Sequence, residues 1–112
     1  MSDPVGEAVG DLAVELAEAI EGVASSLDPR PSRGSSDGAT VWSIGGSPIA
    51  SLFAASASFR VGPEIGAAAR NTPDAAASPL GRDWVAFSPP RLDGHALDRL
   101  VAWFGAAYRR AR

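Results

Sequence analysis

Few side chains in this sequence could exchange protons, attack a substrate or bind a metal. There is no cysteine and only one histidine, His95, which lies near the start of a predicted helix. Without thiolates, disulfides and the common zinc sites are excluded, and one histidine makes neither a metal site nor a catalytic triad. We therefore expect no catalytic residue, no metal site and no cofactor, and we favour a function other than catalysis.

Two further patterns that could carry chemistry have a simple structural interpretation. The acidic residues concentrate on the outer face of the first predicted helix, where carboxylates are usually solvated. Gly45-Gly46 lacks the lysine and the glycine spacing of a phosphate-binding loop. We expect it to be a turn between two strands.

Arginine and tryptophan side chains offer the first candidate binding surface. On a helical wheel of the last predicted helix, Trp103 lies about 120° from the centre of the apolar stripe and shares that flank with Arg99 and Arg110. Arg99 precedes Trp103 by one helical turn, so the two side chains can stack. One interpretation is that Trp103 packs beneath a loop or the first helix. The other is that the three residues contact a partner.

Two more candidate sites draw on the predicted strands and on the other arginines. A pocket between the sheet and the helices would be lined by Trp42, Phe53 and Trp84. A nucleic acid would instead be contacted by cations that bind phosphates. The candidates are the C-terminal arginines and Arg60, Arg70, Arg82 and Arg91. The net charge of −3 disfavours this partner, because dedicated nucleic-acid-binding domains are basic.

Length and composition describe one globular domain. The 112 residues fit a single unit over residues 1–112, large enough to bury one core without disulfides. The acidic N-terminus lacks the pattern of a signal peptide, and the apolar run from Pro48 to Phe59 is too short to cross a bilayer. We therefore expect a cytoplasmic protein with no membrane partner.

The N-terminal part of the chain predicts a helix followed by a loop. Apolar residues recur at helical spacing to about Ser25, and Asp3-Pro4 is a favoured cap and first-turn pair. The acidic face consists of Glu7, Asp11, Glu15 and Glu18. It is either solvated or meets arginines of this chain or of another copy. The segment 28–38, rich in proline, glycine and serine, is expected to be a flexible loop.

The rest of the chain predicts four strands and two more helices. We expect strands over 40–44, 49–53, 58–61 and 83–88, a helix from Gly62 to about Arg70, and a loop over 71–82. The last helix begins at Asp93, and its predicted core stripe is Leu97, Leu100, Val101, Phe104 and Tyr108. The fold class is α+β, with a sheet of about four antiparallel strands, helices packed mainly on one face, and the order α-β-β-β-α-β-α.

Three segments, in this order, resemble small bacterial proteins of two families. They are Val41–Ala50 with its Gly-Gly turn, Phe59–Glu64, and Asp83–Phe87, the last followed by Leu92-Asp93 and a helix ending in Ala107-Tyr108. Over residues 39–110 the layout is similar to the MmcQ/YjbR-like family and to the related-looking uncharacterised family labelled "luciferase domain", a label that does not establish light production. The resemblance implies a compact α+β fold and, for the MmcQ/YjbR-like group, a suggested DNA-binding surface.

Three classes of function follow from these observations. The leading hypothesis is a non-catalytic binding or interaction module whose partner is another protein or a second copy of the chain, as a homodimer. The second is nucleic-acid binding through an arginine-rich face. The third is a small-ligand-binding protein, or an enzyme, with a pocket between sheet and helices.

Overall fold

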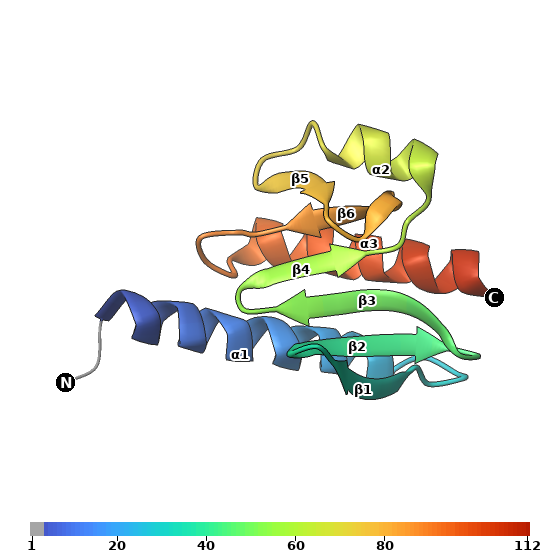
Figure 1. Ribbon diagram of the computed structural model, residues 1–112, viewed down its shortest axis with the longest axis horizontal. Coiled ribbons are helices and arrows are strands. Elements are labelled where there is room, and N and C mark those ends of the chain that lie inside the picture. The colour runs from blue at the N-terminus through green and yellow to red at the C-terminus, as the bar shows by residue number, and fades with distance from the viewer. Residues whose placement is uncertain (1–3) are drawn as a thin grey trace.

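The structure, a computed structural model, describes the backbone of residues 4–112 and the side chains from Gly10 onward. Its helices are α1 (Pro4–Ser25), α2 (Pro63–Ala69) and α3 (Gly94–Ala111). Its strands are β1 (Ser32–Ser36), β2 (Ala39–Ile44), β3 (Ser47–Phe53), β4 (Ser56–Phe59), β5 (Ala75–Ser78) and β6 (Gly81–Phe87). Figure 1 shows this order along the chain. The predicted cap Asp3 and the side chain of Glu7 lie outside the described residues.

The strands form one antiparallel sheet in the order β1-β2-β3-β4-β6-β5. The α+β class is confirmed, but the expectation of about four strands is wrong, because the sheet has six. The element order is therefore α-β-β-β-β-α-β-β-α. The two additional strands, β1 and β5, are the two edge strands, and they lie in the segments 28–38 and 71–82 that were predicted to be loops.

A tight turn explains why β1 forms despite its unfavourable composition. Asp37 and Gly38 are the only residues between β1 and β2, and both have positive φ, 52° and 82°. Asp-Gly is a strongly preferred pair for such a hairpin turn. The turn brings the Ser-Arg-Gly-Ser-Ser strand beside β2, where Gly34 pairs with Val41 and Ser35 with Thr40. Pairing with a neighbour, not intrinsic strand propensity, therefore makes this segment a strand.

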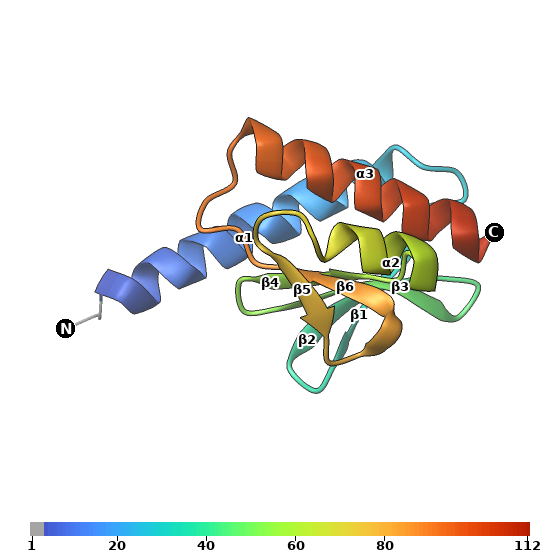
Figure 2. The same ribbon diagram turned by 90° about the horizontal axis from the view of Figure 1, so that it is seen from above.

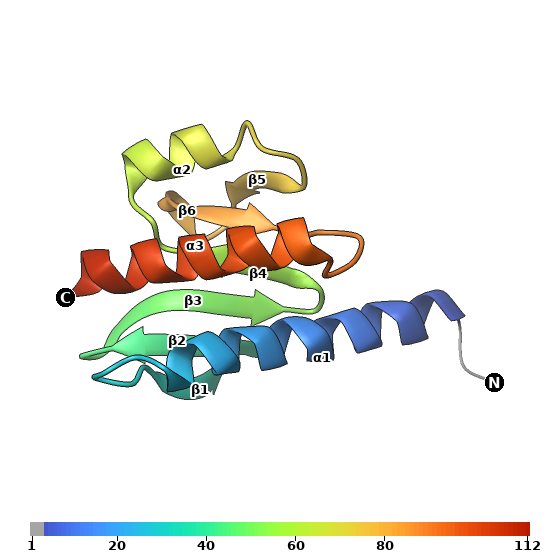
Figure 3. The same ribbon diagram turned by 180° about the vertical axis from the view of Figure 1, so that it is seen from behind.

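The long helices α1 and α3 cover one face of the sheet. Figure 3 shows them crossing the sheet side by side, and Figure 2 shows the opposite face without a helix. The short helix α2 lies beside β5 and β6 at one end of the sheet. In Figure 2 the β1–β2 and β5–β6 turns bend away from α1 and α3, so the helix-free face is concave. Among the described helices, none is both long and apolar enough to cross a membrane.

The core lies between the sheet and the two long helices. Its fully buried side chains include Leu16, Ile20, Trp42, Phe59, Phe87, Leu100 and Phe104. The two pairs of side chains along β6 lie on opposite faces, as alternation predicts: Val85 and Phe87 are in this core, and Trp84 and Ala86 are on the helix-free face.

The buried stripe of α3 differs from the predicted one. Leu97 and Val101 were expected in the core, but their exposed fractions are 41% and 43%. The buried side is instead formed by Ala96, Leu100, Trp103, Phe104, Ala107 and Tyr108. The helix is turned so that Trp103, with the largest apolar surface, faces the sheet and packs edge-on to Phe87 at a centroid distance of 5.2 Å.

Candidate functional site

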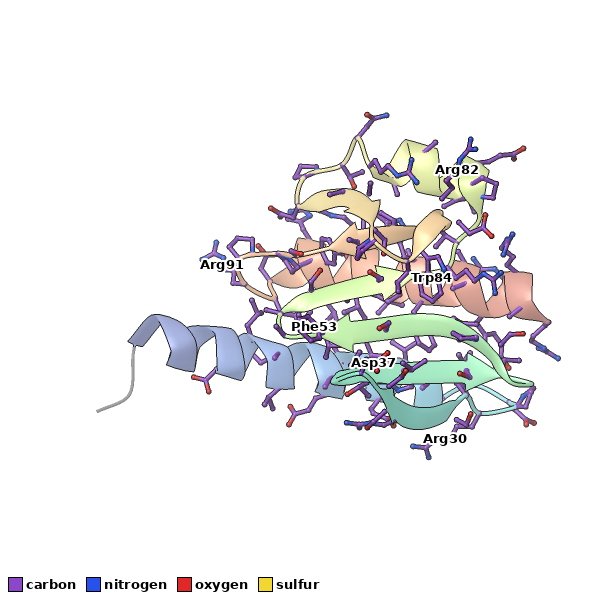
Figure 4. The ribbon with its side chains drawn as sticks, viewed as in Figure 1. Arg30, Asp37, Phe53, Arg82, Trp84 and Arg91 are labelled. Atoms are coloured by element: carbon purple, nitrogen blue, oxygen red, sulfur yellow. The ribbon has the colours of Figure 1, made fainter. Side chains whose placement is uncertain are left out.

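The main cavity of the described structure is a hollow of about 750 Å³ on the concave, helix-free face. Strands β1 to β4 and β6 line it, together with the β1–β2 and β5–β6 turns. Its larger side chains are Arg33, Val41, Pro48, Phe53, Pro79, Leu80 and Trp84. Figure 4 shows Phe53, Trp84 and Asp37 on this side of the sheet. This volume is typical of ligand-binding clefts, which hold roughly 300–1,000 Å³.

The two-residue periodicity of the strands brings the lining residues together. Val41 pairs with Ser51, and Ser51 pairs with Ser58, so these three side chains lie in a row across β2, β3 and β4. Phe53 lies two residues beyond Ser51 on the same face and pairs with Ser56. The neighbours Ala50, Leu52 and Ala57 point to the opposite face and enter the core. The apolar residues of the hollow are therefore excess apolar surface that the core does not use.

Phe53 and Leu80 are the two lining residues with large exposed apolar surfaces. Their exposed fractions are 62% and 51%. Phe53 lies against the β1–β2 turn, where a Cβ added at Gly38 would be 3.6 Å from its Cε2 atom. Leu80 belongs to the β5–β6 turn at the other side of the sheet. Trp84 lies lower in the hollow and is only 9% exposed.

The polar groups of the hollow are mainly hydroxyls. Seven serines line it: Ser32, Ser35, Ser36, Ser43, Ser51, Ser56 and Ser58. Three of these hydroxyls are already engaged. Ser58 Oγ lies 3.0 Å from Ser78 Oγ, Ser56 Oγ accepts a hydrogen bond of 2.9 Å from Ser88, and Ser32 Oγ donates one of 3.4 Å to the carbonyl of Ser43. The only charged lining residues are Arg33 and Asp37. The hollow can therefore hold apolar groups and hydrogen-bond uncharged ones, but it lacks a histidine or a pair of carboxylates for acid–base catalysis.

Arg33 is directed from β1 toward α1 by an ionic cluster on Glu21. The Glu21 carboxylate accepts a hydrogen bond of 2.8 Å from Trp42 Nε1 and one of 3.0 Å from Arg30 Nη2. Arg33 Nη1 lies 3.6 Å from the same carboxylate, and its guanidinium lies 5.6 Å from the Trp42 ring centroid. The hydrogen bond from the Trp42 indole holds the pKa of Glu21 below its usual value, opposed by desolvation and reinforced by Arg30 and Arg33.

Glu21, which was not part of the predicted acidic face, differs from the other described acidic residues of α1. Glu21 meets two arginines of this chain, whereas Asp11, Glu15 and Glu18 are exposed to solvent. Trp42 lies on the helix-covered face, where it pairs with Ala50 in the core and donates to Glu21. Of the three residues predicted to line a pocket between sheet and helices, only Phe53 and Trp84 share a cavity, and it is on the opposite face.

The predicted flank of Arg99, Trp103 and Arg110 does not form an exposed surface. Trp103 is 9% exposed and packs against Phe59 and Phe87. Arg99 Nη1 donates a hydrogen bond of 2.7 Å to the carbonyl of Pro73. Arg110 lies eleven residues after Arg99, which corresponds to about 16 Å along the axis of α3, so the two side chains are far apart. Of the two interpretations of Trp103, the structure therefore has the one in which this side chain is packed in the interior.

Several of the arginines proposed for nucleic-acid contact are engaged with groups of this chain, and Arg91 lies apart from Arg82. Arg60 Nη2 lies 3.8 Å from Asp83, Arg70 Nη2 donates to the carbonyl of Arg82, and Arg91 lies 3.7 Å from Asp93. Figure 4 shows Arg82 and Arg91 at separate ends of the molecule.

Sequence reasoning missed Leu80, Val41 and the serines of the hollow. The signal for Val41 and Ser51 was present, because alternation along two predicted strands places them on the face of Phe53. Leu80 carried no comparable signal, since it lies in a segment that was expected to be a loop.

Among residues 10–112, His95 and the acidic side chains do not gather into a metal-binding group. His95 is exposed in the first turn of α3, whose cap is the Asp93 side chain, hydrogen-bonded by the Ala96 N–H at 2.9 Å. That hydrogen bond is the main reason why the pKa of Asp93 is lowered. Over the part of the chain that the structure describes, no group of three potential metal-binding side chains comes together.

Comparisons with known proteins return no relative. No family model matches the chain, and neither a curated protein nor a solved structure is similar to it. The resemblance to the MmcQ/YjbR-like family stays a prediction, and the arguments on function rest on the geometry of this chain.

Proposed function

We propose that this protein is a non-catalytic binding module that holds an extended, largely uncharged segment of a partner protein in the hollow on the helix-free face. The observation that supports this most directly is the pair of exposed apolar side chains, Phe53 and Leu80, on two sides of that hollow. A partner that covered them would gain on the order of 1–2 kcal/mol for each side chain.

The edge strand β1 supports an extended ligand. It is the outermost strand on its side of the sheet, and all five of its residues are exposed. Its outer edge presents backbone N–H and C=O groups that no neighbouring strand uses, and these are a template for another strand. Apart from Arg33, its side chains are serines and a glycine, which leave room for an incoming chain. A segment paired with β1 would lie beside the hollow and could place alternate side chains in it.

The chemistry of the lining supports binding and not turnover. Free serine hydroxyls can hydrogen-bond the backbone of a bound segment, while the lining includes no histidine, the residue that most often activates a serine. The mixture of aromatic, aliphatic and hydroxyl groups suits an uncharged ligand, because Arg33 is already turned toward Glu21.

A small uncharged ligand is the second candidate, and the volume of the hollow favours it. About 750 Å³ would enclose most of a drug-sized molecule. The two candidates differ in their use of β1: an extended segment needs its outer edge, whereas a small molecule needs only the central strands.

An uncharged apolar dye tests whether the hollow accepts apolar groups. Nile red fluorescence should increase on titration into the native protein, with an affinity about tenfold lower in Phe53→Ser, because the main exposed apolar contact is lost. The matched control is Ile65→Ser on α2, where an apolar side chain that is 46% exposed lies outside the hollow. Circular dichroism checks that both variants fold. Equal dye affinity in the native protein and in Phe53→Ser would refute this site.

A further inference from the structure

A second, smaller cavity lies at the end of the sheet where α3 finishes. Its volume is about 240 Å³, and two of its lining residues are Arg60, directly after β4, and Arg110, in the last turn of α3. Between them lies the carboxylate of Asp83 at the start of β6. Its Oδ2 atom is 3.8 Å from Arg60 Nη2 and 3.6 Å from Arg110 Nη2.

The two guanidiniums have donors to spare. Both distances to Asp83 are longer than a charged hydrogen bond, which spans about 2.7–2.9 Å. Among residues 10–112, the side chains of Arg60 and Arg110 donate no hydrogen bond, although each carries five N–H donors. The Nε atom of Arg60 is also enclosed by protein and has no partner among the described atoms. An enclosed donor without a partner is unfavourable, and such groups in native proteins call for an explanation.

The backbone holds Arg110 in position. A Cβ added at Gly62 would lie 2.8 Å from Arg110 Nε, so this side chain packs directly on the glycine backbone. Gly62 has φ of 96°, a conformation that favours glycine. Both features place the Arg110 guanidinium over the start of α2 and beside Asp83. Because the side chain is already held there, a ligand would not have to supply the free energy that orders it.

The charge balance at this cavity is positive. One carboxylate faces two guanidiniums at Asp83, and of the two further arginines nearby in sequence, Arg109 lies in the last turn of α3 and Arg112 is its C-cap. The carbonyl end of a helix attracts cations, which explains why arginines gather there. It does not explain the unpaired donors, because neither Arg60 nor Arg110 is hydrogen-bonded to a carbonyl within the described residues.

We propose that Arg60 and Arg110 form a binding site for a single oxyanion group, a phosphate or a carboxylate, in this cavity. Guanidinium groups bind both through paired N–H donors. An oxyanion between the two side chains would receive the donors that Asp83 does not reach. The lining also includes Ser47, whose hydroxyl can donate to the same anion. The site is independent of the proposed function, because it uses neither Phe53 nor β1.

The competing explanation is that Arg60, Asp83 and Arg110 are only an ion triad that fastens α3 to the sheet. Asp83→Asn separates the two explanations, because it removes the anion that competes with a ligand but keeps the size of the side chain. If the cavity binds oxyanions, this substitution should raise phosphate affinity several-fold. If the residues are only a structural triad, it should lower stability without creating phosphate affinity.

Inorganic phosphate, titrated by isothermal calorimetry at constant ionic strength, is the probe, with acetate in a second arm to separate phosphate from carboxylate. We expect saturable binding with one site, a loss of about tenfold or more in Arg60→Gln and in Arg110→Gln, and tighter binding in Asp83→Asn. Arg91→Gln is the matched control, since Arg91 is 83% exposed and pairs with Asp93.

Three results would overturn the proposal: no heat of binding with either anion in the native protein, equal losses in Arg60→Gln and Arg91→Gln, or no gain in Asp83→Asn. Because the anions are too small and too polar to report on the hollow, these results would leave the proposed function unaffected.

Discussion

Glu21 is the side chain that joins the first helix to the first hairpin. It accepts a hydrogen bond from the indole of Trp42, a residue with no exposed surface, and lies within ion-pair distance of Arg30 and Arg33. A buried indole N–H has no water to replace a lost partner. Through Arg33, the same carboxylate holds β1, which is one side of the hollow. Glu21, which does not line the hollow, therefore helps to position β1 at its side.

Replacing Glu21 with alanine should lower the free energy of unfolding by about 1–3 kcal/mol, because the Trp42 N–H is left without a partner. Glu18→Ala, which removes an exposed carboxylate from the same helix, should change it by less than about 0.5 kcal/mol. Urea unfolding at neutral pH measures both values. Similar effects in the two variants would mean that the hydrogen bond to Trp42 contributes little.

The contribution of Glu21 should also depend on pH. Because its pKa is lowered in the folded protein from 4.5, the ionised group stabilises the fold above that value, and the contribution is lost as the pH falls through the lowered folded pKa. The difference in unfolding free energy between the native protein and Glu21→Gln should therefore shrink as the pH is lowered from about 7 to about 3. A difference that stayed constant over this range would contradict the role of the charge.

At the scale of elements, the side of α3 that is buried differs from the apolar stripe predicted from the sequence, because the packing of α3 against the sheet determines it. Leu97 and Leu100 both belong to an apolar stripe in the sequence, but Leu100 is fully buried whereas Leu97 is 41% exposed. Packing of Trp103 against Phe59 and Phe87 turns the helix toward the sheet along the Leu100 side. This rotation also removes Trp103 from the surface.

A matched pair of substitutions tests this rotation. Leu100→Ala should cost about 2–5 kcal/mol, because it leaves a cavity in the core, whereas Leu97→Ala should cost less than about 1 kcal/mol. Thermal and urea unfolding of the two variants give the comparison. If the two substitutions destabilised the protein equally, the buried side of α3 would be the one that the sequence stripe predicted.

The elements also show what could be predicted from the sequence. Long periodic helices and the apolar strands β2, β3 and β6 carry local signals, and these were found. The strands β1 and β5 consist of serine, arginine, glycine and alanine, residues with little strand propensity. They become strands because turns place them beside β2 and β6. Asp37-Gly38 was the one local signal for β1.

The candidate site was predicted only in part, for a related reason. Alternation placed Phe53 and Trp84 in strands but did not say which face of the sheet the helices cover. Trp42 therefore seemed equivalent to them, although its indole is bound to α1. The face of the sheet that the helices cover depends on the connections between strands and helices along the whole chain. The sequence of a single strand therefore does not predict which face stays uncovered.

At the scale of the whole molecule, the protein has one covered and one uncovered sheet face. Figure 2 shows α1 and α3 on one face of the sheet. The core side buries nearly all of its aromatic surface, while Phe53 and Leu80 stay exposed at the hollow of the other face, and β1 is an edge strand of the sheet. Exposed apolar residues gathered in a concavity mark an interaction site more often than isolated ones do. This arrangement supports the binding module that we propose.

Selection of random ten-residue peptides against the immobilised native protein tests the central claim most directly. The account predicts uncharged, partly apolar peptides that bind about tenfold or more weakly to Phe53→Ser and to Gly34→Pro, which alters the backbone of β1, but equally well to Ile65→Ser. Circular dichroism and thermal unfolding would show that each variant is folded. Peptides that bind Phe53→Ser and Gly34→Pro as tightly as the native protein would contradict the claim that the hollow and the β1 edge are the binding site.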